Sequence, residues 1–331
     1  MTSPDMQDRF RGCLIGQALG DACGFPLEGM PVKRCREQAG KAVAGKLERS
    51  EAGFAFGQYT DDTQMAVAIA RSLAEKQSAD PADVARRFAE LWSEGRIVGQ
   101  GLACRTAVLS IIDGTPWDQA GAAEGRAGNG TAMRTAPLGL FFHQDTEALF
   151  AAADEIARIT HRDMRSRAGA VAISQAVAQL VQGGEPSAPA VLEPAAAMAS
   201  RLHQEFADWI LQLGNHLDDP EEEAVKWFTT VGFTDGGTDG WEGITPYVIP
   251  TVLGSLYAFL KHPKEYTSAI RFVIACGGDV DTTAAITGAL SGSHLGLTAL
   301  PDLAKKVTDR GRNNYDDLVA LADQLFEIVA N

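Results

Sequence analysis

Apolar residues recur along most of this chain at the spacing of one helical face. Residues 9–24 carry such a face at Phe10, Cys13, Leu14 and Ala18. Residues 63–76 are apolar nearly all round, which predicts a central helix. No segment alternates with a period of two, and clusters of β-branched residues are few. The pattern therefore predicts a nearly all-α fold.

Further helices are predicted from the same spacing and from their start signals. Asp80 before Pro81 is a good N-cap pair for a helix that carries Val84, Phe88, Leu91 and Trp92. The remaining predicted helices cover residues 145–182 with a break near 160–163, then 193–216, 220–230, 249–260, 264–276 and a last one around 318–328. Residues 24–60 read instead as a long irregular stretch. Composition is similar on both sides of the loop at 183–189, so we expect one domain, 1–331, of about a dozen helices.

Composition and charge narrow the class of protein. The chain has 331 residues, of which 45% are hydrophobic, so it can bury a large core. Its formal net charge of −14 disfavours nucleic-acid binding through a basic face. Five cysteines without a C-x-x-C pair fit a reducing compartment. With no secretion signal and no apolar run of about 18 residues, we expect a cytoplasmic protein that does not enter the membrane.

Two acidic corners, each followed by an apolar helical run, stand out chemically. The first is Gly57-Gln58-Tyr59-Thr60-Asp61-Asp62-Thr63-Gln64, and the second is Gly277-Gly278-Asp279-Val280-Asp281-Thr282-Thr283. Their oxygen ligands suit magnesium, manganese or calcium better than zinc or copper. The plain alternative is a helix N-cap with an acidic first turn. Because two such corners occur, we expect the fold to bring them together around divalent metal.

Other polar positions have two interpretations each. Asp21, at the end of an apolar stripe, either caps or hydrogen-bonds a neighbouring turn or has a functional role. The Gly-rich residues 125–134 form either an anion-binding loop or an ordinary turn. His161 by itself is more typical of a capping or core histidine. The P-loop-like residues 40–47 and the calcium-loop-like residues 235–246 lack required ligands, so neither is assigned.

Five motifs in order resemble the ADP-ribosylglycohydrolase family, which includes the dinitrogenase-reductase-activating glycohydrolases. They are Gly20-Asp21-Ala22-Cys23-Gly24 with Glu28, Tyr59-Thr60-Asp61-Asp62-Thr63, Gly128-Asn129-Gly130-Thr131-Ala132-Met133-Arg134, Thr160-His161 and Gly278-Asp279-Val280-Asp281-Thr282. The resemblance runs from about residue 9 to 297, and it is the order of the five that makes it specific. It implies an all-α hydrolase that cleaves ADP-ribose from an ADP-ribosylated protein or a small ADP-ribosyl conjugate.

The resemblance also implies a site. Two Mg²⁺ or Mn²⁺ ions would be held by Thr60, Asp61, Asp62, Asp279, Asp281 and Thr282. Glu28 matches an acidic residue near the metals, a candidate general acid or base, and Asp62 and Asp279 complete the expected catalytic set. The loop Gly128-Asn129-Gly130 and His161 would hold the diphosphate and ribose, Tyr247 would line the nucleotide pocket, and Gly101 is expected to bind substrate with them. The metals would hold the sugar and polarise a water molecule for attack.

The chain departs from the family pattern at two places. Arg126-Ala127 precedes Gly128 where relatives often carry a hydroxyl and an aromatic residue, and Val98-Gly99 stands where arginine-specific relatives have an acid. The loop with Asp235, Asp239 and Trp241 is a candidate for acceptor recognition. The competing interpretations are a non-catalytic binder of ADP-ribose or a related nucleotide, and a structural protein on the same fold, such as a lens-type crystallin.

Overall fold

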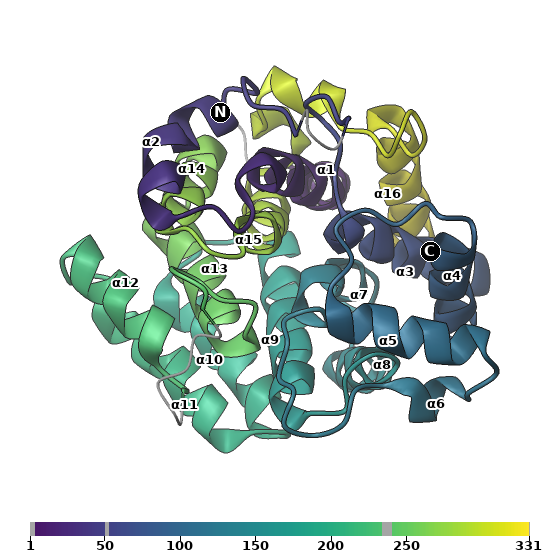
Figure 1. Cartoon of the computed structure of the whole chain (residues 1–331). Helices are drawn as coiled ribbons and strands as arrows, with labels where there is room; N and C mark the ends of the chain where they lie inside the picture. Colours follow the sequence, from purple (N-terminus) through teal and green to yellow (C-terminus); the bar gives the residue numbers. More distant parts are fainter. Residues whose placement is uncertain (1–3, 50–52, 234–239, 331) are drawn as a thin grey trace.

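Helices make up the computed structural model, which describes residues 4–49, 53–233 and 240–330 (Figure 1). The α-helices are α1 Met6–Gly24, α2 Val32–Ala42, α3 Asp61–Lys76, α4 Pro81–Ser93, α5 Leu102–Ile112, α6 Trp117–Ala120, α7 Ala136–Phe141, α8 Thr146–Arg158, α9 Met164–Val181, α10 Ala188–Ser200, α11 Gln204–Gln212, α12 Glu221–Thr230, α13 Val248–Lys261, α14 Tyr266–Cys276, α15 Val280–Leu295 and α16 Tyr315–Ala330. Short 3₁₀ turns lie at Phe25–Leu27, Ala132–Arg134, Leu213–His216, Leu297–Ala299 and Asp302–Lys306. Within the described ranges no β-strand forms, only isolated bridges, so the all-α prediction is confirmed.

The centre of the molecule is the antiparallel pair of α1 and α15, which lie against each other in Figure 1. Small residues one helical turn apart form the contact: Gly12, Gly16, Gly20 and Gly24 on α1 face Gly292, Gly288, Ala284 and Val280 on α15. A Cβ atom built at Gly16 would lie 2.4 Å from the carbonyl oxygen of Gly288, and one at Gly288 would lie 2.1 Å from that of Gly16. The two backbones thus approach as closely as only glycine permits.

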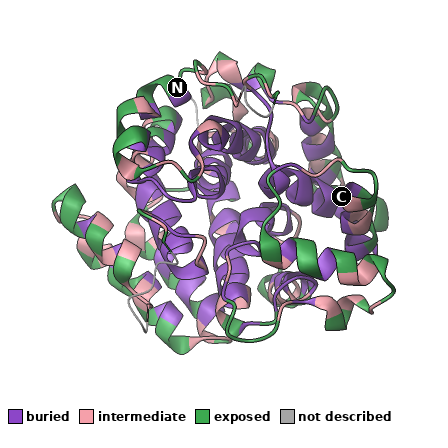
Figure 2. Cartoon of the chain, in the orientation of Figure 1, coloured by how far each residue is buried: buried purple, intermediate pink, exposed green. Residues whose placement is uncertain are grey.

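This close packing places the two acidic corners. Because the helices run in opposite directions, the end of α1 meets the start of α15, where Gly24 lies against the backbone of Val280 and Asp281. Figure 2 shows α1, α15 and α9 as the buried interior, whereas α12 and α4 expose one face. The functional residues at these helix ends are therefore attached to the most buried part of the fold.

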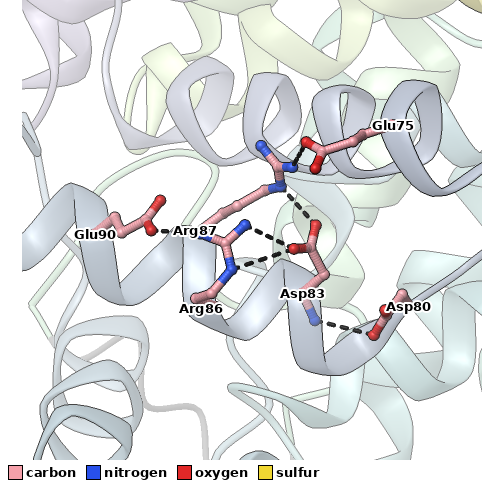
Figure 3. Close-up of polar contacts among 6 residues, drawn as sticks. All are labelled: Glu75, Asp80, Asp83, Arg86, Arg87 and Glu90. Carbon is pink, nitrogen blue, oxygen red and sulfur yellow. Dashed lines mark hydrogen bonds and ion pairs between the residues drawn. The ribbon is translucent and has the colours of Figure 1, made fainter.

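Helix α3, which carries the first acidic corner, is joined to α4 by an ion pair between Glu75 and Arg87 (Figure 3). The guanidinium of Arg87 bridges Asp83 Oδ2, at 2.6 Å, and the carboxylate of Glu75 on α3. Asp83 also accepts a hydrogen bond from Arg86 at 2.7 Å, and Asp80 caps α4 by accepting from the Asp83 N–H at 3.0 Å. Burial alone would raise the pKa of Asp83, but its bonds to Arg87 and Arg86 hold it below the ordinary value. These contacts link the last turn of α3 to the first half of α4.

The predicted helices correspond to observed ones, with corrections to their bounds and number, because sixteen α-helices form in the described ranges instead of about a dozen. The break near 160–163 separates α8 from α9 as expected, and Asp80 caps α4. Residues 24–60 are not one irregular stretch, because α2 forms over Val32–Ala42 and buries Cys35, Ala39 and Ala42 against the core. The helical spacing of these three small residues was missed in the sequence because charged residues lie among them. Residues 193–216 hold most of α10, then α11 and a 3₁₀ turn, and α10 begins earlier than predicted, at Ala188.

No described helix combines the length and apolar character needed to span a bilayer.

The glycine contact yields a stability prediction. Gly16→Ala should lower the free energy of unfolding by about 2–3 kcal/mol, because the methyl group forces two backbones apart. The matched control is Gly40→Ala in α2, where a Cβ meets nothing within 4 Å; it should be neutral or stabilise by about 0.5–1 kcal/mol. Urea unfolding followed by circular dichroism measures both. Equal stability of the two variants would contradict the close α1–α15 contact.

Candidate active site

The structure brings the two acidic corners together. Asp61 and Asp62 open α3, while Asp279 and Asp281 lie at the start of α15, and all four side chains are buried. Burial raises the pKa of each of the four carboxyls, and the charge of Asp279 raises the pKa values of Asp61, Asp62 and Asp281 further. Carboxylates more than two hundred residues apart in the chain therefore lie near enough to affect one another's ionisation.

Asp21 and Gln17, one turn apart on α1, hold the first corner. Asp21 Oδ2 accepts hydrogen bonds from the Thr60 N–H at 3.0 Å, the Thr63 N–H at 3.1 Å and the Thr63 hydroxyl at 2.6 Å, and its Oδ1 accepts from the Thr60 hydroxyl at 3.0 Å. Gln17 Nε2 donates to the carbonyl of Asp62 at 3.2 Å. The interpretation of Asp21 as a carboxylate that hydrogen-bonds a neighbouring turn is confirmed, and that turn is the first acidic corner itself.

Both corners are helix starts, but they differ in capping: the Thr60 side chain caps α3, whereas Asp279, at the N-cap of α15, makes no side-chain cap hydrogen bond. Thr60 has extended backbone, and its hydroxyl oxygen accepts from the Asp62 N–H at 3.4 Å. The same hydroxyl lies 2.8 Å from Asp62 Oδ2. At the second corner the Thr282 N–H donates to Asp281 Oδ1 at 3.0 Å. The helix N-termini partly offset the buried negative charge.

The side-chain oxygens of the two corners match the ligand preferences of a divalent cation. They are carboxylate and hydroxyl oxygens, the ligands that Mg²⁺ and Mn²⁺ take. Asp62 Oδ1 is buried without a hydrogen-bond partner, and none of the four carboxylates forms an ion pair with a described side chain. As they stand, however, no three His, Cys, Asp or Glu side chains in the described ranges are grouped so as to hold an ion. The chemistry fits a cation, and the carboxylates would have to turn toward it.

Glu28 lies next to the second corner. The Gly29 N–H donates to the carbonyl of Gly278 at 3.3 Å, which holds the segment after α1 against the start of α15. Burial, and next the charge of Asp279, raise the pKa of Glu28. Arg49 opposes this shift through an ion pair with Glu28 at 3.0 Å. Arg49 was missed in the sequence, because nothing near residue 49 predicts contact with residue 28.

The glycine loop, Tyr247 and the second corner form one surface. Gly128 pairs with Tyr247 as an isolated bridge, and the Asn129 N–H donates to the carbonyl of Pro246 at 3.0 Å. Asn129 Nδ2 donates to Asp279 Oδ2 at 2.7 Å and to the Thr251 hydroxyl at 2.9 Å. The backbone N–H of Asn129 is thus already used, so the loop is not an open row of free donors. Its amide side chain is what reaches the acidic site.

The other expected substrate-binding residues surround this surface. The Gly101 N–H donates to Asp61 Oδ2 at 3.4 Å. His161 is buried, and Tyr247 is half-buried with its hydroxyl donating to the carbonyl of Gly232 at 3.1 Å. Arg165 lies over the Tyr247 ring at 5.7 Å, a cation–π contact that the sequence did not indicate.

The departures noted in the sequence fall at the site's edge. Arg126 is exposed, and Gly99, with a φ of 72°, lies close to Thr60 and Asp61. Of the loop considered for acceptor recognition, Trp241 is half-buried, whereas Asp235 and Asp239 lie outside the described residues.

Comparison with known proteins places this architecture. The family model described as ADP-ribosylglycohydrolase matches residues 2–331. The ADP-ribosyl-[dinitrogen reductase] glycohydrolase of Rhodospirillum rubrum is 30% identical over 97% of this chain and 99% of its own length. The ADP-ribosylhydrolase ARH3 of Homo sapiens is 26% identical over 97% and 93%, respectively. A solved structure, described as an ADP-ribosylglycohydrolase-related protein complex, superposes with a TM-score of 0.71 at 25% identity, covering 98% of this chain and 99% of that one.

The raised carboxyl pKa values predict that the stability of the protein depends on pH when a chelator keeps the site free of metal. The folded chain binds more protons than the unfolded chain above about pH 4, so the free energy of unfolding should fall as the pH rises. Burial raises the pKa of Asp21 to about 7, which puts much of the fall below neutrality. We expect a loss of roughly 2–4 kcal/mol between about pH 5 and 8. Urea unfolding over this range measures it; stability that stays level or rises with pH would contradict the buried acidic cluster.

Proposed function

The chain belongs to the ADP-ribosylglycohydrolase family, and we propose that it uses two divalent cations to hydrolyse the bond between the anomeric carbon of ADP-ribose and an acceptor. Membership in this family supports hydrolytic removal of ADP-ribose. The observation that carries the metal-dependent mechanism is the gathering of Asp61, Asp62, Asp279 and Asp281 in one buried place. A fold that concentrates like charges in this way needs a counter-charge, and a cation supplies it.

Thr60, Asp61, Asp62, Asp279, Asp281 and Thr282 would hold two Mg²⁺ or Mn²⁺ ions. When bound, such ions act as Lewis acids on sugar oxygens and lower the pKa of water. The unpartnered Asp62 Oδ1 is the oxygen with most to gain, because it gives up no hydrogen bond when it turns toward a cation. Asp279 is constrained differently: its Oδ2 accepts from Asn129 at 2.7 Å, so substrate in the glycine loop and the second corner are linked through one side chain.

The remaining residues bind and orient the substrate. Gly128, Asn129, Gly130 and His161 would receive the diphosphate and ribose, with Tyr247 against the nucleotide and Gly101 at the edge beside Asp61. Fixing the sugar in this way converts attack by water into an intramolecular reaction.

Glu28 is the candidate for moving a proton. Its pKa is raised by burial and by Asp279, which brings the carboxyl closer to the range in which a group both takes and gives protons near neutrality. The ion pair with Arg49 lowers the pKa of Glu28, so the distance between the two side chains affects how readily Glu28 is protonated. The acceptor is either a modified protein side chain or a small ADP-ribosyl conjugate.

Metal binding is a first test. Isothermal titration of the full chain with Mn²⁺ should show binding, and Asp62→Asn should weaken it by about tenfold or more, since a charged ligand is lost. The control is Asp302→Asn, an exposed carboxylate paired only with Lys305, which should bind like the wild type. Unchanged affinity in Asp62→Asn would argue against this ligand set.

Turnover is the second test. The wild type should release ADP-ribose from at least one of a panel of arginine-, serine- and guanidine-type conjugates and ADP-ribose polymers, and a chelator should abolish release. Asp279→Asn should lower kcat by roughly 10²-fold or more, with Asp302→Asn again unaffected. Tight ADP-ribose binding without turnover would favour the non-catalytic binder, and failure to bind any divalent metal would favour a structural protein.

A further inference from the structure

Arg134 is a fully buried cation without a carboxylate in direct contact among the described residues. Its Nη2 donates to the Thr160 hydroxyl at 2.8 Å and to the carbonyl of Ile156 at 3.2 Å, and the guanidinium lies 4.9 Å from the centre of the Phe88 ring. Moving a charged guanidinium from water into the core costs free energy, so a buried arginine indicates a structural or functional role. One of its two oxygen partners, Thr160, adjoins His161.

The bond from Arg134 determines what the Thr160 hydroxyl can do. An arginine only donates, so the hydroxyl oxygen accepts from it and keeps its own single proton to donate. Two acceptors are near: His161 Nδ1 at 2.9 Å and the thiol of Cys104. Imidazole nitrogen is the stronger acceptor, whereas thiol sulfur is a weak one. Nδ1 is thus the better acceptor for the hydroxyl proton, and a proton given to Nδ1 leaves the neutral imidazole with its own proton on Nε2.

The other edge of the ring faces the glycine loop. A Cβ built at Gly128 would lie 3.0 Å from His161 Nε2, and one at Gly130 would lie 3.0 Å from Cε1, so a side chain at either position would crowd this edge of the ring. In the described ranges, the hydrogen bond of the His161 ring runs through Nδ1, and Nε2 has no protein partner. The backbone is held as well, because the Ala122 N–H donates to the carbonyl of Thr160 at 2.8 Å and the Arg162 N–H to that of Ala122 at 2.9 Å.

We propose that Arg134 and Thr160 are positioning residues that fix His161 as the Nε2–H tautomer, so that it donates a hydrogen bond to an oxygen of ADP-ribose held at Gly128–Gly130. This rests on the proposed function for the identity of the ligand, but the tautomer itself does not. His161 is then a neutral donor and takes no part in proton transfer. Burial, and next the charge of Arg134, lower its pKa to about 3, which agrees with this role.

The tautomer is directly measurable. Long-range ¹H–¹⁵N correlation spectra of the full chain, labelled with ¹⁵N-histidine, distinguish protonated from unprotonated ring nitrogens, and His161→Gln assigns the signal among the six histidines. We expect a protonated Nε2 and an unprotonated Nδ1 that stay unchanged between about pH 5.5 and 8. A protonated Nδ1, or a mixture of the two tautomers, would overturn the proposal.

Two substitutions at Thr160 distinguish the Arg134–Thr160–His161 hydrogen-bond chain, called the relay below, from a purely packing role of Thr160. Thr160→Val keeps the shape but removes the hydroxyl; the tautomers should mix, and affinity for ADP-ribose, measured by calorimetry, should fall roughly tenfold. Thr160→Ser keeps the hydroxyl and should retain both the wild-type tautomer and an affinity within about twofold. A Thr160→Val protein with the wild-type tautomer and affinity would refute the relay. If Thr160→Val does not fold, the wild-type and Thr160→Ser spectra still decide.

Failure of the proposed function gives a different result. A wild type that shows the Nε2–H tautomer but binds no ADP-ribose would reject the ligand and leave the Arg134–Thr160–His161 relay in place. Binding of ADP-ribose without any change in the His161 Nε2 proton signal would reject the donor role while leaving the proposed function in place.

Discussion

The close approach of α1 and α15 is the constraint on which the rest of the structure depends. Their glycines let the two backbones touch, and the antiparallel direction places the end of α1 beside the start of α15. Asp21 and Gln17 then reach across from α1 to the start of α3, so a third helix is fixed to the same pair. Each acidic corner is thus attached to the least deformable part of the core, where small shifts have no room to occur.

The site is built against the ordinary preferences of protein interiors. Asp21, Asp61, Asp62, Asp279 and Asp281 are all buried. Burial raises the pKa values of Asp62 and Asp281, and the charges of Asp21 and Asp279 raise both further. Hydrogen bonds from Thr60 and Thr63 and two helix N-termini offset part of this cost. What is left is a buried negative potential and an unpartnered oxygen on Asp62, and this is the electrostatic environment in which divalent cations bind.

Opposite charges are kept apart within the same region. Arg134 lies in the core, where its charge interacts with Asp61 without a direct contact. Its hydrogen bonds go to the Thr160 hydroxyl, to the carbonyl of Ile156 and to the sulfur atoms of Met65 and Cys104. Arg49 pairs with Glu28. Arg134 thus orients the neutral His161 through Thr160, whereas Arg49 lowers the pKa of Glu28. The Asn129 side chain connects the glycine loop to Asp279.

The amino-acid sequence alone determined the helical class, most of the helix starts and the two acidic corners. Periodicity and capping are local properties, so Asp80, Thr60 and the apolar run of α3 carry their own signal. The sequence did not reveal α2, because the few apolar residues of this amphipathic helix lie among charged ones. Only the tertiary structure decided which atoms meet: that Asp21 binds the turn at Thr60, that Arg49 reaches Glu28, and that Arg134 touches Thr160. These contacts join residues from different elements of the fold, so no short segment encodes them.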